Sequence, residues 1–311
     1  MFIGMVLFFG AVLPRYDVEF KDVVDLAVEL EGLGYRSLWV TDHLQPGRAS
    51  RVLESWTLLT ALAPATDVRL GTSVLCTCYR HPALLAKMAA TLDVVSYGRL
   101  ELGVGAGSEP QENELKSLGM SSVDPSSRVE HLREYVEVLR LLLTGVGQVN
   151  FSGKFYRLSS ALPNTPPYQK PTFPIWVGAR RPRMVRLAAE IGDGWNFYGE
   201  TVEEYMNVLK VFEERCRALG RNPSRSVFTN VVVYRNADEQ RERLQKLGSY
   251  PTVEEALRKT FTLLHGSPDQ VVKQVETMAS NGVGLIILRD MDVKASSLRL
   301  FAEEVMPSFN P

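Results

Sequence analysis

The sequence predicts a parallel α/β protein made of about eight strand–helix units. Short apolar runs alternate with longer segments in which apolar residues recur at helical spacing. The first of these runs is continuously apolar, as expected for a strand that helices cover on both faces. The length of 311 residues suits one α/β barrel as well as two smaller domains. We therefore expect a single domain over residues 1–311 with right-handed crossovers.

Eight apolar runs are the expected strands, and nine segments between or after them are the expected helices. The strands are Phe2–Phe9, Arg36–Thr41, Val68–Leu75, Leu100–Val104, Phe173–Val177, Gly194–Phe197, Ser226–Tyr234 and Gly284–Leu288. The helices are Val18–Leu33, Val52–Ala63, His81–Ser96, Ser127–Leu143, Pro182–Ile191, Val202–Leu219, Val253–Leu264, Pro268–Asn281 and Ala295–Val305. Boundary residues support several ends: Pro82 stands at a first helical position, and Gly34 and Gly220 follow last turns.

The segment 146–173 is expected to be an insertion into the repeat of strands and helices. Within it, Gln148–Asn150 and Phe155–Leu158 predict a short hairpin around a turn at Ser152-Gly153. The segment is longer than the usual connection between barrel elements, and long ordered loops often cover binding sites. We therefore expect it to lie over the substrate site.

The composition is that of a soluble globular protein, with 45% hydrophobic and 23% charged residues. A formal net charge of -1 provides no basic field for nucleic acid. No apolar run approaches the roughly 20 residues that span a bilayer, and the apolar N-terminus lacks the basic region and cleavage site of a signal peptide. Three cysteines make no disulfide framework, so the cytoplasm is the expected location. Together with four scattered histidines they predict no metal site.

The stretch Ser37–Gly47, SLWVTDHLQPG, places an acid and an imidazole at the end of a predicted strand. The apolar run Ser37–Val40 leads into Asp42 and His43. In a parallel α/β fold, the carboxyl ends of the strands are where catalytic groups gather. An imidazole titrates near neutral pH and can exchange a proton with a substrate. The alternative is a structural pair at the strand end, since Asp is a good helix N-cap residue.

A second candidate site is the turn Gly178-Ala179-Arg180-Arg181, which joins a predicted strand to a helix with Pro182 in its first turn. Backbone N–H groups at a helix N-terminus bind phosphate, and small residues let the phosphate approach closely. Arginines at this end oppose the helix dipole, but they would form charge-assisted hydrogen bonds with a phosphodiester. We therefore expect a cofactor phosphate at this turn, and the alternative is a solvated pair of arginines.

Three stretches together resemble the luciferase-like superfamily, and most of all its coenzyme F420-dependent oxidoreductases. They are SLWVTDHL, LGTSVLCTCYRHPALLAKMAATLDVVSYGRLELGVGAG and FPIWVGARRPRMVRLAAEIGDGWN. The resemblance covers nearly the whole chain, from Phe2 to about Pro307. It implies a (β/α)8 TIM barrel with insertions, of the bacterial luciferase type, which holds coenzyme F420 at its C-terminal rim. It also implies a small-molecule substrate and a homodimer.

The resemblance assigns roles at the ends of the second and third strands. In F420-dependent relatives, the residue at the position of Asp42 approaches the cofactor ring or orients the imidazole, and the one at His43 lies beside the site of hydride transfer. The third strand of such relatives ends in a non-proline cis peptide behind the ring. The resemblance places that bond at Ser73–Val74, with Cys76 also along the cofactor. The residue pattern alone would make this an ordinary strand end.

The turn Gly105-Ala106-Gly107 after the fourth strand is expected to let the backbone approach a planar ring closely. The alternative is a tight turn with no ligand. An acid after this turn donates a proton in some relatives, and Glu109 is the residue nearest to the turn. Glu112 and Glu114 are the other acids of this segment. A solvated acidic start of a helix is the competing explanation.

We therefore expect an oxidoreductase that moves a hydride between coenzyme F420 and a small organic substrate, with His43 and Glu109 handling protons. One alternative is an FMN-dependent monooxygenase of the same superfamily, and another is a non-catalytic flavin-binding protein. The sugar-phosphate dehydrogenases of the family carry a Trp shortly after a Gln-Pro pair, where this chain has Gly47. A sugar phosphate is therefore a less favoured substrate.

Overall fold

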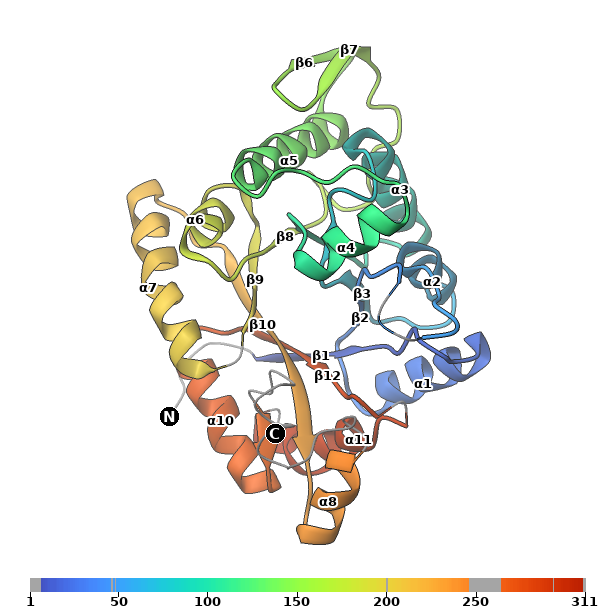
Figure 1. The fold of residues 1–311 in the computed structure, drawn as a ribbon, viewed down its shortest axis with the longest axis vertical. Helices are drawn as coiled ribbons and strands as arrows, with labels where there is room; N and C mark the ends of the chain where they lie inside the picture. Colours follow the sequence, from blue (N-terminus) through green and yellow to red (C-terminus); the bar gives the residue numbers. More distant parts are fainter. Residues whose placement is uncertain are drawn as a thin grey trace.

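The computed structural model describes residues 7–45, 47, 49–199, 201–245, 264–292 and 294–309. Within these ranges, eight parallel strands pair in a closed ring, and each strand contacts its neighbours in the order β1-β2-β3-β5-β8-β9-β10-β12 and back to β1. The helices surround this ring in Figure 1. The predicted (β/α)8 barrel is therefore confirmed.

The bounds of the elements follow the chain. The barrel strands are β1 (Phe8–Val12), β2 (Ser37–Val40), β3 (Arg69–Thr72), β5 (Leu100–Gly105), β8 (Ile175–Gly178), β9 (Gly194–Tyr198), β10 (Ser224–Val233) and β12 (Leu285–Arg289). The shorter strands are β4 (Leu75–Cys76), β6 (Val149–Ser152), β7 (Arg157–Ala161) and β11 (Leu264–Gly266). The helices are α1 (Phe20–Gly32), α2 (Ser55–Leu62), α3 (Pro82–Val95), α4 (Glu109–Ser117), α5 (Arg128–Thr144), α6 (Pro182–Ile191), α7 (Val202–Leu219), α8 (Ala237–Gln245), α10 (Pro268–Ser280), α11 (Ser296–Glu304) and the 3-10 turn η1 (Met306–Ser308).

Helices α6 and α7 have the predicted bounds because their ends carry strong local signals. Pro182 stands in the first turn of α6, where its missing N–H has no helical partner to lose. At the start of α7 the Thr201 hydroxyl accepts a hydrogen bond from the backbone N–H of Glu204, at 3.0 Å. Gly220 ends α7 in the left-handed conformation, with φ 62°.

The first strand ends later than the sequence pattern predicts. Residues 2–6 lie outside the described residues, and β1 runs on through Gly10 to Val12 rather than ending at Phe9. Gly10 is tolerated inside the strand because Trp39 of β2 packs directly against it: a Cβ there would lie 2.5 Å from the indole Nε1.

Two short helices carry no periodic apolar signal and are not predicted. Helices α4 and α8 are almost entirely polar. The predicted helix Val253–Leu264 lies outside the described residues except for Leu264, and there the prediction is wrong. Leu264 pairs with Val231 of β10 and begins strand β11.

Two large rings fill the barrel interior. Trp39 of β2 and Trp176 of β8 meet edge to face, with centroids 6.4 Å apart. Gly71 and Gly194, each on a strand next to one of these rings, leave the space that they occupy: a Cβ would lie 2.2 Å from Trp39 Cε3 and 2.1 Å from Trp176 Cε3, respectively. The rest of the core lies between the strands and the surrounding helices.

The insertion contains the predicted hairpin, β6–β7, which projects beyond α5 in Figure 1. Tyr156 next to β7 shares a hydrogen bond of 2.6 Å with Nε2 of His131 on α5. The carboxylate of Glu134, also on α5, accepts hydrogen bonds from the backbone N–H groups of Lys154 (2.8 Å) and Phe155 (2.9 Å). The hairpin is thus fixed to α5.

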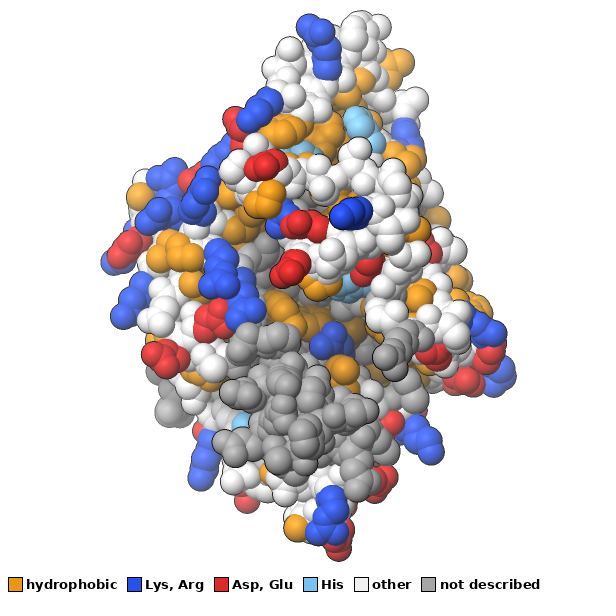
Figure 2. Space-filling view, viewed as in Figure 1, with side chains coloured by type: hydrophobic (Ala, Val, Ile, Leu, Met, Phe, Trp, Pro, Cys, Tyr) orange, Lys and Arg blue, Asp and Glu red, His pale blue; other side chains and the backbone are white. Residues whose placement is uncertain are grey.

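The surface mixes charges of both signs. On the face drawn in Figure 2, acidic and basic side chains are interspersed, in keeping with the formal net charge of -1. Among the helices of the described residues, none combines the length and the apolar character needed to cross a membrane.

Candidate active site

A cleft of about 530 Å³ lies at the carboxyl ends of the barrel strands. His43 reaches it from the segment after β2, Asn113 and Glu114 from α4, and Arg289 from the last residue of β12. Tyr16, beyond the end of β1, completes one side. Catalytic groups of α/β barrels come from this end, because the loops that follow the strands converge there. The cleft is therefore the candidate active site.

His43 and Glu114 form the central pair of the cleft. Nδ1 of His43 lies 2.7 Å from Oε1 of Glu114. The His43 side chain is 31% exposed and the Glu114 side chain 6% exposed. Oε2 of Glu114 accepts hydrogen bonds from the N–H groups of Leu44 (2.6 Å) and Gln45 (3.1 Å) and from the hydroxyl of Tyr79 (2.8 Å). The imidazole is thus held by a carboxylate that is itself fixed on several sides.

The surroundings of Glu114 favour its ionised form. Burial raises its pKa, but hydrogen bonds from His43, from the backbone N–H groups of Gln45 and Leu44 and from Tyr79 together outweigh burial and lower the pKa below its usual value of 4.5. A carboxylate can only accept hydrogen bonds, so Nδ1 of His43 carries a proton. The nitrogen left for chemistry is then Nε2.

Helix α4 decides which of its acids meets His43. The backbone N–H of Ser108, which precedes the helix, donates to Oε1 of Gln111 (3.0 Å), and Nε2 of Gln111 donates to the backbone oxygen of Asp42 (2.9 Å). This fixes the helix beside β2. Glu109 and Glu114 are five residues apart, or about 140° round a helix of 3.6 residues per turn. Glu114 therefore faces the cleft and Glu109 is exposed outside it.

The other acid of this segment also has another partner, since Glu112 pairs with Arg128 of α5. The sequence favours Glu109 as the proton-donating acid, but in the structure the acid that contacts His43 is Glu114. A catalytic role for Glu109 stays a prediction, whereas Glu114 is in direct contact with His43.

Asp42 is buried beneath the cleft and has partners for both oxygens. Arg80 donates to Oδ2 from one terminal nitrogen (2.8 Å) and to Oδ1 from the other (3.1 Å). The backbone N–H of Cys76 donates to Oδ2 (2.9 Å), and Ser55 Oγ donates to Oδ1 (3.0 Å). The expectation that Asp42 orients the imidazole is wrong, because Glu114 does so. A contact of Asp42 with a cofactor ring stays a prediction.

The third barrel strand ends in the predicted cis peptide, Ser73–Val74. The Val74 side chain lies against glycines from two other strands: a Cβ at Gly105 would lie 2.6 Å from Val74 Cγ2, and one at Gly178 would lie 2.7 Å from it. The Ser73 hydroxyl donates to Oδ1 of Asn196 on β9, at 3.1 Å. The structure thus brings together three predicted cofactor positions that are far apart in the sequence.

Cys76 lies under the turn Gly105-Ala106-Gly107. Ala106 is buried, and Gly107 has φ 83°, a conformation that favours glycine. A Cβ at Gly107 would lie 3.2 Å from Sγ of Cys76. The Cys76 thiol shares a hydrogen bond with the thiol of Cys78. This bond raises the pKa of Cys76 and lowers the pKa of Cys78 to about 6.

The turn before α6 has the predicted shape, but one of its arginines has a protein partner. The backbone N–H of Ala179 donates to the backbone oxygen of Asn196 (3.0 Å). Arg180 pairs with Glu204 of α7, with its NH2 group 3.1 Å from Oε2. This ion pair explains a cation at this helix end without a phosphate. Arg181 is exposed at the N-cap of α6, and no side chain there caps the helix. A phosphate at this turn stays a prediction.

Arg289 belongs to the cleft and is not among the predicted site residues. Its Nε donates to Oδ1 of Asn230 on β10 (2.6 Å), and its guanidinium carbon lies 5.3 Å from the centroid of the Phe228 ring. Burial lowers its pKa below the usual value of an arginine. The sequence contains the signal that would find it: like Asp42-His43, it is a charged residue at the carboxyl end of an apolar strand.

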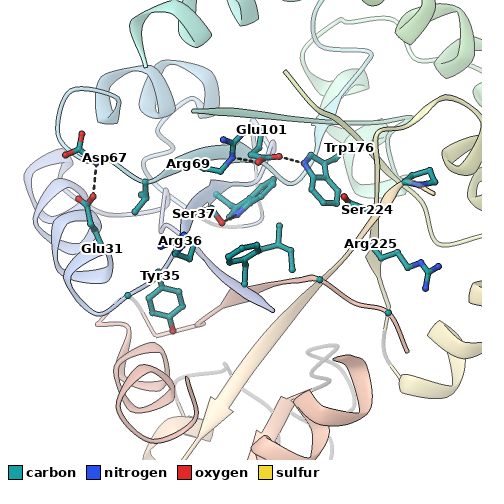
Figure 3. Close-up of a pocket in the computed structure, with 18 of the residues that line it drawn as sticks. Glu31, Tyr35, Arg36, Ser37, Asp67, Arg69, Glu101, Trp176, Ser224 and Arg225 are labelled. Carbon is teal, nitrogen blue, oxygen red and sulfur yellow. Dashed lines mark hydrogen bonds and ion pairs between the residues drawn. The ribbon is translucent and has the colours of Figure 1, made fainter. Parts of the chain in front are cut away.

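A larger cavity, of about 1140 Å³, lies at the opposite end of the barrel, where the strands begin (Figure 3). Glu101 of β5 pairs there with Arg69 of β3 and accepts a hydrogen bond from Nε1 of Trp176. Glu31 accepts one from the backbone N–H of Asp67 (2.8 Å). In α/β barrels this end serves stability rather than catalysis.

Comparisons with known proteins identify the family of this chain. A family model described as "Luciferase-like monooxygenase" matches residues 1–259. The chain belongs to the luciferase-like monooxygenase family. The resemblance read from three stretches of the sequence is therefore confirmed.

Two curated relatives show how this luciferase-like protein matches enzymes of known activity. An F420-dependent glucose-6-phosphate dehydrogenase of Amycolatopsis mediterranei (strain U-32) is 36% identical over 179 residues, which cover 56% of this chain and 52% of that protein. The chain spans about half the length of the curated relatives it matches in this way. A 5,10-methylenetetrahydromethanopterin reductase of Archaeoglobus fulgidus is 26% identical over 342 residues, which cover 95% and 96% of the two chains.

A solved structure shares the fold of nearly the whole chain. An F420-dependent secondary alcohol dehydrogenase, in complex with an F420-acetone adduct, matches with a TM-score of 0.84 at 22% identity. The match covers 98% of this chain and 99% of the other. At this identity the likeness is one of fold.

Proposed function

We propose that this protein is an oxidoreductase that transfers a hydride between coenzyme F420 and a small organic substrate. The observation that carries the proposal is the His43–Glu114 pair, which lines a cleft at the carboxyl ends of the barrel strands. The cis peptide Ser73–Val74 follows the carboxyl end of β3. The relatives support the cofactor, since several are named as F420-dependent dehydrogenases. The pair supports the chemistry, because hydride transfer needs a group that takes up or supplies a proton.

The residues of the rim fit a flat ring with a phosphate tail. Gly105 and Gly178 have no Cβ atoms, so their strands lie close against Val74. Gly107 likewise lets the turn after β5 lie close to Cys76. The N-terminus of α6 has N–H groups that no side chain caps, which suits a phosphate. In this arrangement Gly105, Ala106, Ser73, Val74 and Cys76 would hold the ring, and Gly178–Arg181 the phosphate. When bound, F420 supplies a carbon that accepts or gives a hydride.

The protein's own contribution is to present Nε2 of His43 as the atom that exchanges a proton with the substrate. Glu114 fixes the ring orientation and keeps the proton on Nδ1, so that Nε2 can take a proton from a substrate hydroxyl or return one to a carbonyl oxygen. The imidazolium that forms is stabilised by the adjacent carboxylate. Proton transfer by a positioned histidine contributes about 10²–10⁴-fold to a rate.

Binding decides the cofactor. Apo-protein titrated with F420 and, separately, with FMN should show tight quenching of F420 fluorescence and weak binding of FMN. With F420 bound, absorbance at 420 nm then follows turnover across a panel of alcohols and carbonyl compounds. Preferred binding of FMN, with oxygen consumption, would replace the proposal by a monooxygenase activity. Tight F420 binding with no turnover in any reaction direction would favour a non-catalytic flavin-binding protein.

We also propose a homodimer in a reducing compartment such as the cytoplasm. Leu84 and Val95 on α3 and Tyr97 after it are exposed apolar side chains, and Tyr97 meets Tyr168 edge to face at 6.2 Å. Such a surface favours pairing with another copy. All three cysteines are free thiols, as in a reducing environment. Sedimentation of wild type and Tyr97→Glu tests the dimer, and the variant should be monomeric.

A further inference from the structure

Arg289 has no acidic partner among the described residues, whereas other arginines at the same rim do. Arg80 is bound by Asp42 and Glu54, and Arg180 by Glu204. Arg15, which is buried there, also lacks one, but it donates hydrogen bonds to the backbone oxygens of Leu53 and His43. For Arg289, no carboxylate of the described residues lies within ion-pair distance, and the guanidinium is half-buried in the cleft that also holds His43. A cation in such a position costs free energy unless an anion joins it.

The contacts of Arg289 leave one edge of its guanidinium available. Nε is used by Oδ1 of Asn230, and the Phe228 ring lies beside the guanidinium carbon. These two contacts fix the plane of the group. The two terminal nitrogens have no hydrogen-bond acceptor within the described residues. A guanidinium edge that is held in this way matches the two oxygens of a carboxylate.

We propose that Arg289 binds the carboxylate of the substrate, so that the enzyme acts on small carboxylic acids. The inference rests on the proposed function for the identity of the reaction, and on the geometry of the cleft for the anion. Arg289 and His43 line the same cavity of about 530 Å³, which suits a compact acid with its reacting carbon near the imidazole. The carboxylate of Glu114 does not compete for Arg289, because its oxygens already contact His43, Tyr79 and two backbone N–H groups.

Three probes with the same ring test the anion site without turnover. Benzoate, benzamide and phenyl phosphate are titrated against the full-length protein by saturation-transfer NMR, with and without F420. Wild type should bind benzoate at least tenfold more tightly than benzamide. Arg289→Met should lose at least tenfold in benzoate affinity and nothing in benzamide affinity. Arg289→Lys keeps the charge but not the planar edge, so its affinity for benzoate should lie between that of wild type and that of Arg289→Met.

Arg36→Met is the matched control. Arg36 is an exposed arginine that lies over the Phe8 ring at the other end of the barrel, with its guanidinium carbon 5.5 Å from the centroid. The Arg36→Met substitution removes the same charge from the protein as Arg289→Met, and it should leave benzoate binding unchanged. Equal affinities of wild type for benzoate and benzamide, or equal losses in the two Met variants, would overturn the proposal. Tighter binding of phenyl phosphate than of benzoate would overturn the carboxylate assignment.

The two proposals fail in different ways. F420 fluorescence is titrated with the same protein samples, and Arg289→Met should bind F420 as wild type does. Normal F420 binding without a preference for benzoate would remove the carboxylate site and leave the oxidoreductase. Benzoate binding that depends on Arg289, in a protein that does not bind F420, would keep the anion site and remove the proposed reaction. Thermal unfolding of each variant shows that the binding data come from folded protein.

Discussion

The two ends of the barrel handle charged side chains differently. At the end where the strands begin, a cavity of about 1140 Å³ contains the buried Glu101, which is bound by Arg69 and Trp176. At the other end, a cleft less than half as large, about 530 Å³, holds a partly exposed imidazole on a fixed carboxylate. It also holds Arg289, which has no acidic partner within the part of the chain that the structure describes. The size of a cavity is thus a poor guide to function here. The candidate active site is marked instead by titratable or charged groups that have room for a further partner, such as Nε2 of His43 and the guanidinium of Arg289.

The strongest test of this contrast is His43→Ala. Removing the imidazole takes away the proton carrier but little packing, because the side chain is 31% exposed. We expect kcat to fall about 10²–10⁴-fold, with F420 affinity and melting temperature close to wild type. Measurements are the rate at 420 nm with the substrate found by screening, F420 titration and thermal unfolding. An active His43→Ala enzyme would remove the central pair from the mechanism.

Glu101→Gln tests whether the end of the barrel where the strands begin contributes to stability and not to activity. The change leaves Arg69 and Nε1 of Trp176 with a weaker acceptor in a largely buried place, and we expect a loss of about 2 kcal/mol in the free energy of unfolding. Activity per folded molecule should not change. Urea unfolding measures the first quantity and the initial rate at low temperature the second. If Glu101→Gln lost activity while folded, the separation of the two ends would be broken.

Glu114→Gln links the cleft to pH. Because the folded-state pKa of Glu114 lies below the ordinary 4.5, its carboxylate stabilises the fold above about pH 4.5, and this contribution is lost as pH falls through the folded-state pKa. The variant lacks it at every pH. We expect a melting temperature about 3 °C lower than wild type at pH 7, from roughly 1 kcal/mol of lost hydrogen bonding. The difference should shrink as the pH falls below about 4.5 and the wild type becomes protonated. A difference that grows in acid would contradict the lowered pKa.

The sequence predicts the barrel well because each strand and helix carries its own local pattern. It also predicts His43, since a charged group after an apolar strand lies at the rim whatever its neighbours are. The same rule also places Arg289 at the rim, because it directly follows the apolar run of the last strand. The choice between Glu109 and Glu114 needs the start and the facing side of α4, a polar helix without a periodic apolar signal.

Other parts of the site depend on contacts that no local pattern contains. Val74 meets Gly105 and Gly178, which come from two other strands, and Arg180 meets Glu204 of another helix. The expectation that the segment 146–173 lies over the substrate site stays a prediction. Tyr156 and the backbone of the hairpin attach to α5, and none of the residues at 146–173 lines the cleft.

A pair of glycine substitutions sharpens the comparison at the level of single methyl groups. Gly178→Ala would place its Cβ 2.7 Å from Val74 Cγ2, so the wall behind the predicted ring must shift. We expect a loss of about 1 kcal/mol in stability and weaker F420 binding. Gly32→Ala adds the same methyl group at the last turn of α1, where no atom lies within 4 Å. Alanine is the better helix former there, so stability should rise by about 0.5 kcal/mol and F420 affinity should not move. Equal F420 affinities of the two variants would show that Gly178 matters to the core alone, and would place the cofactor away from Val74.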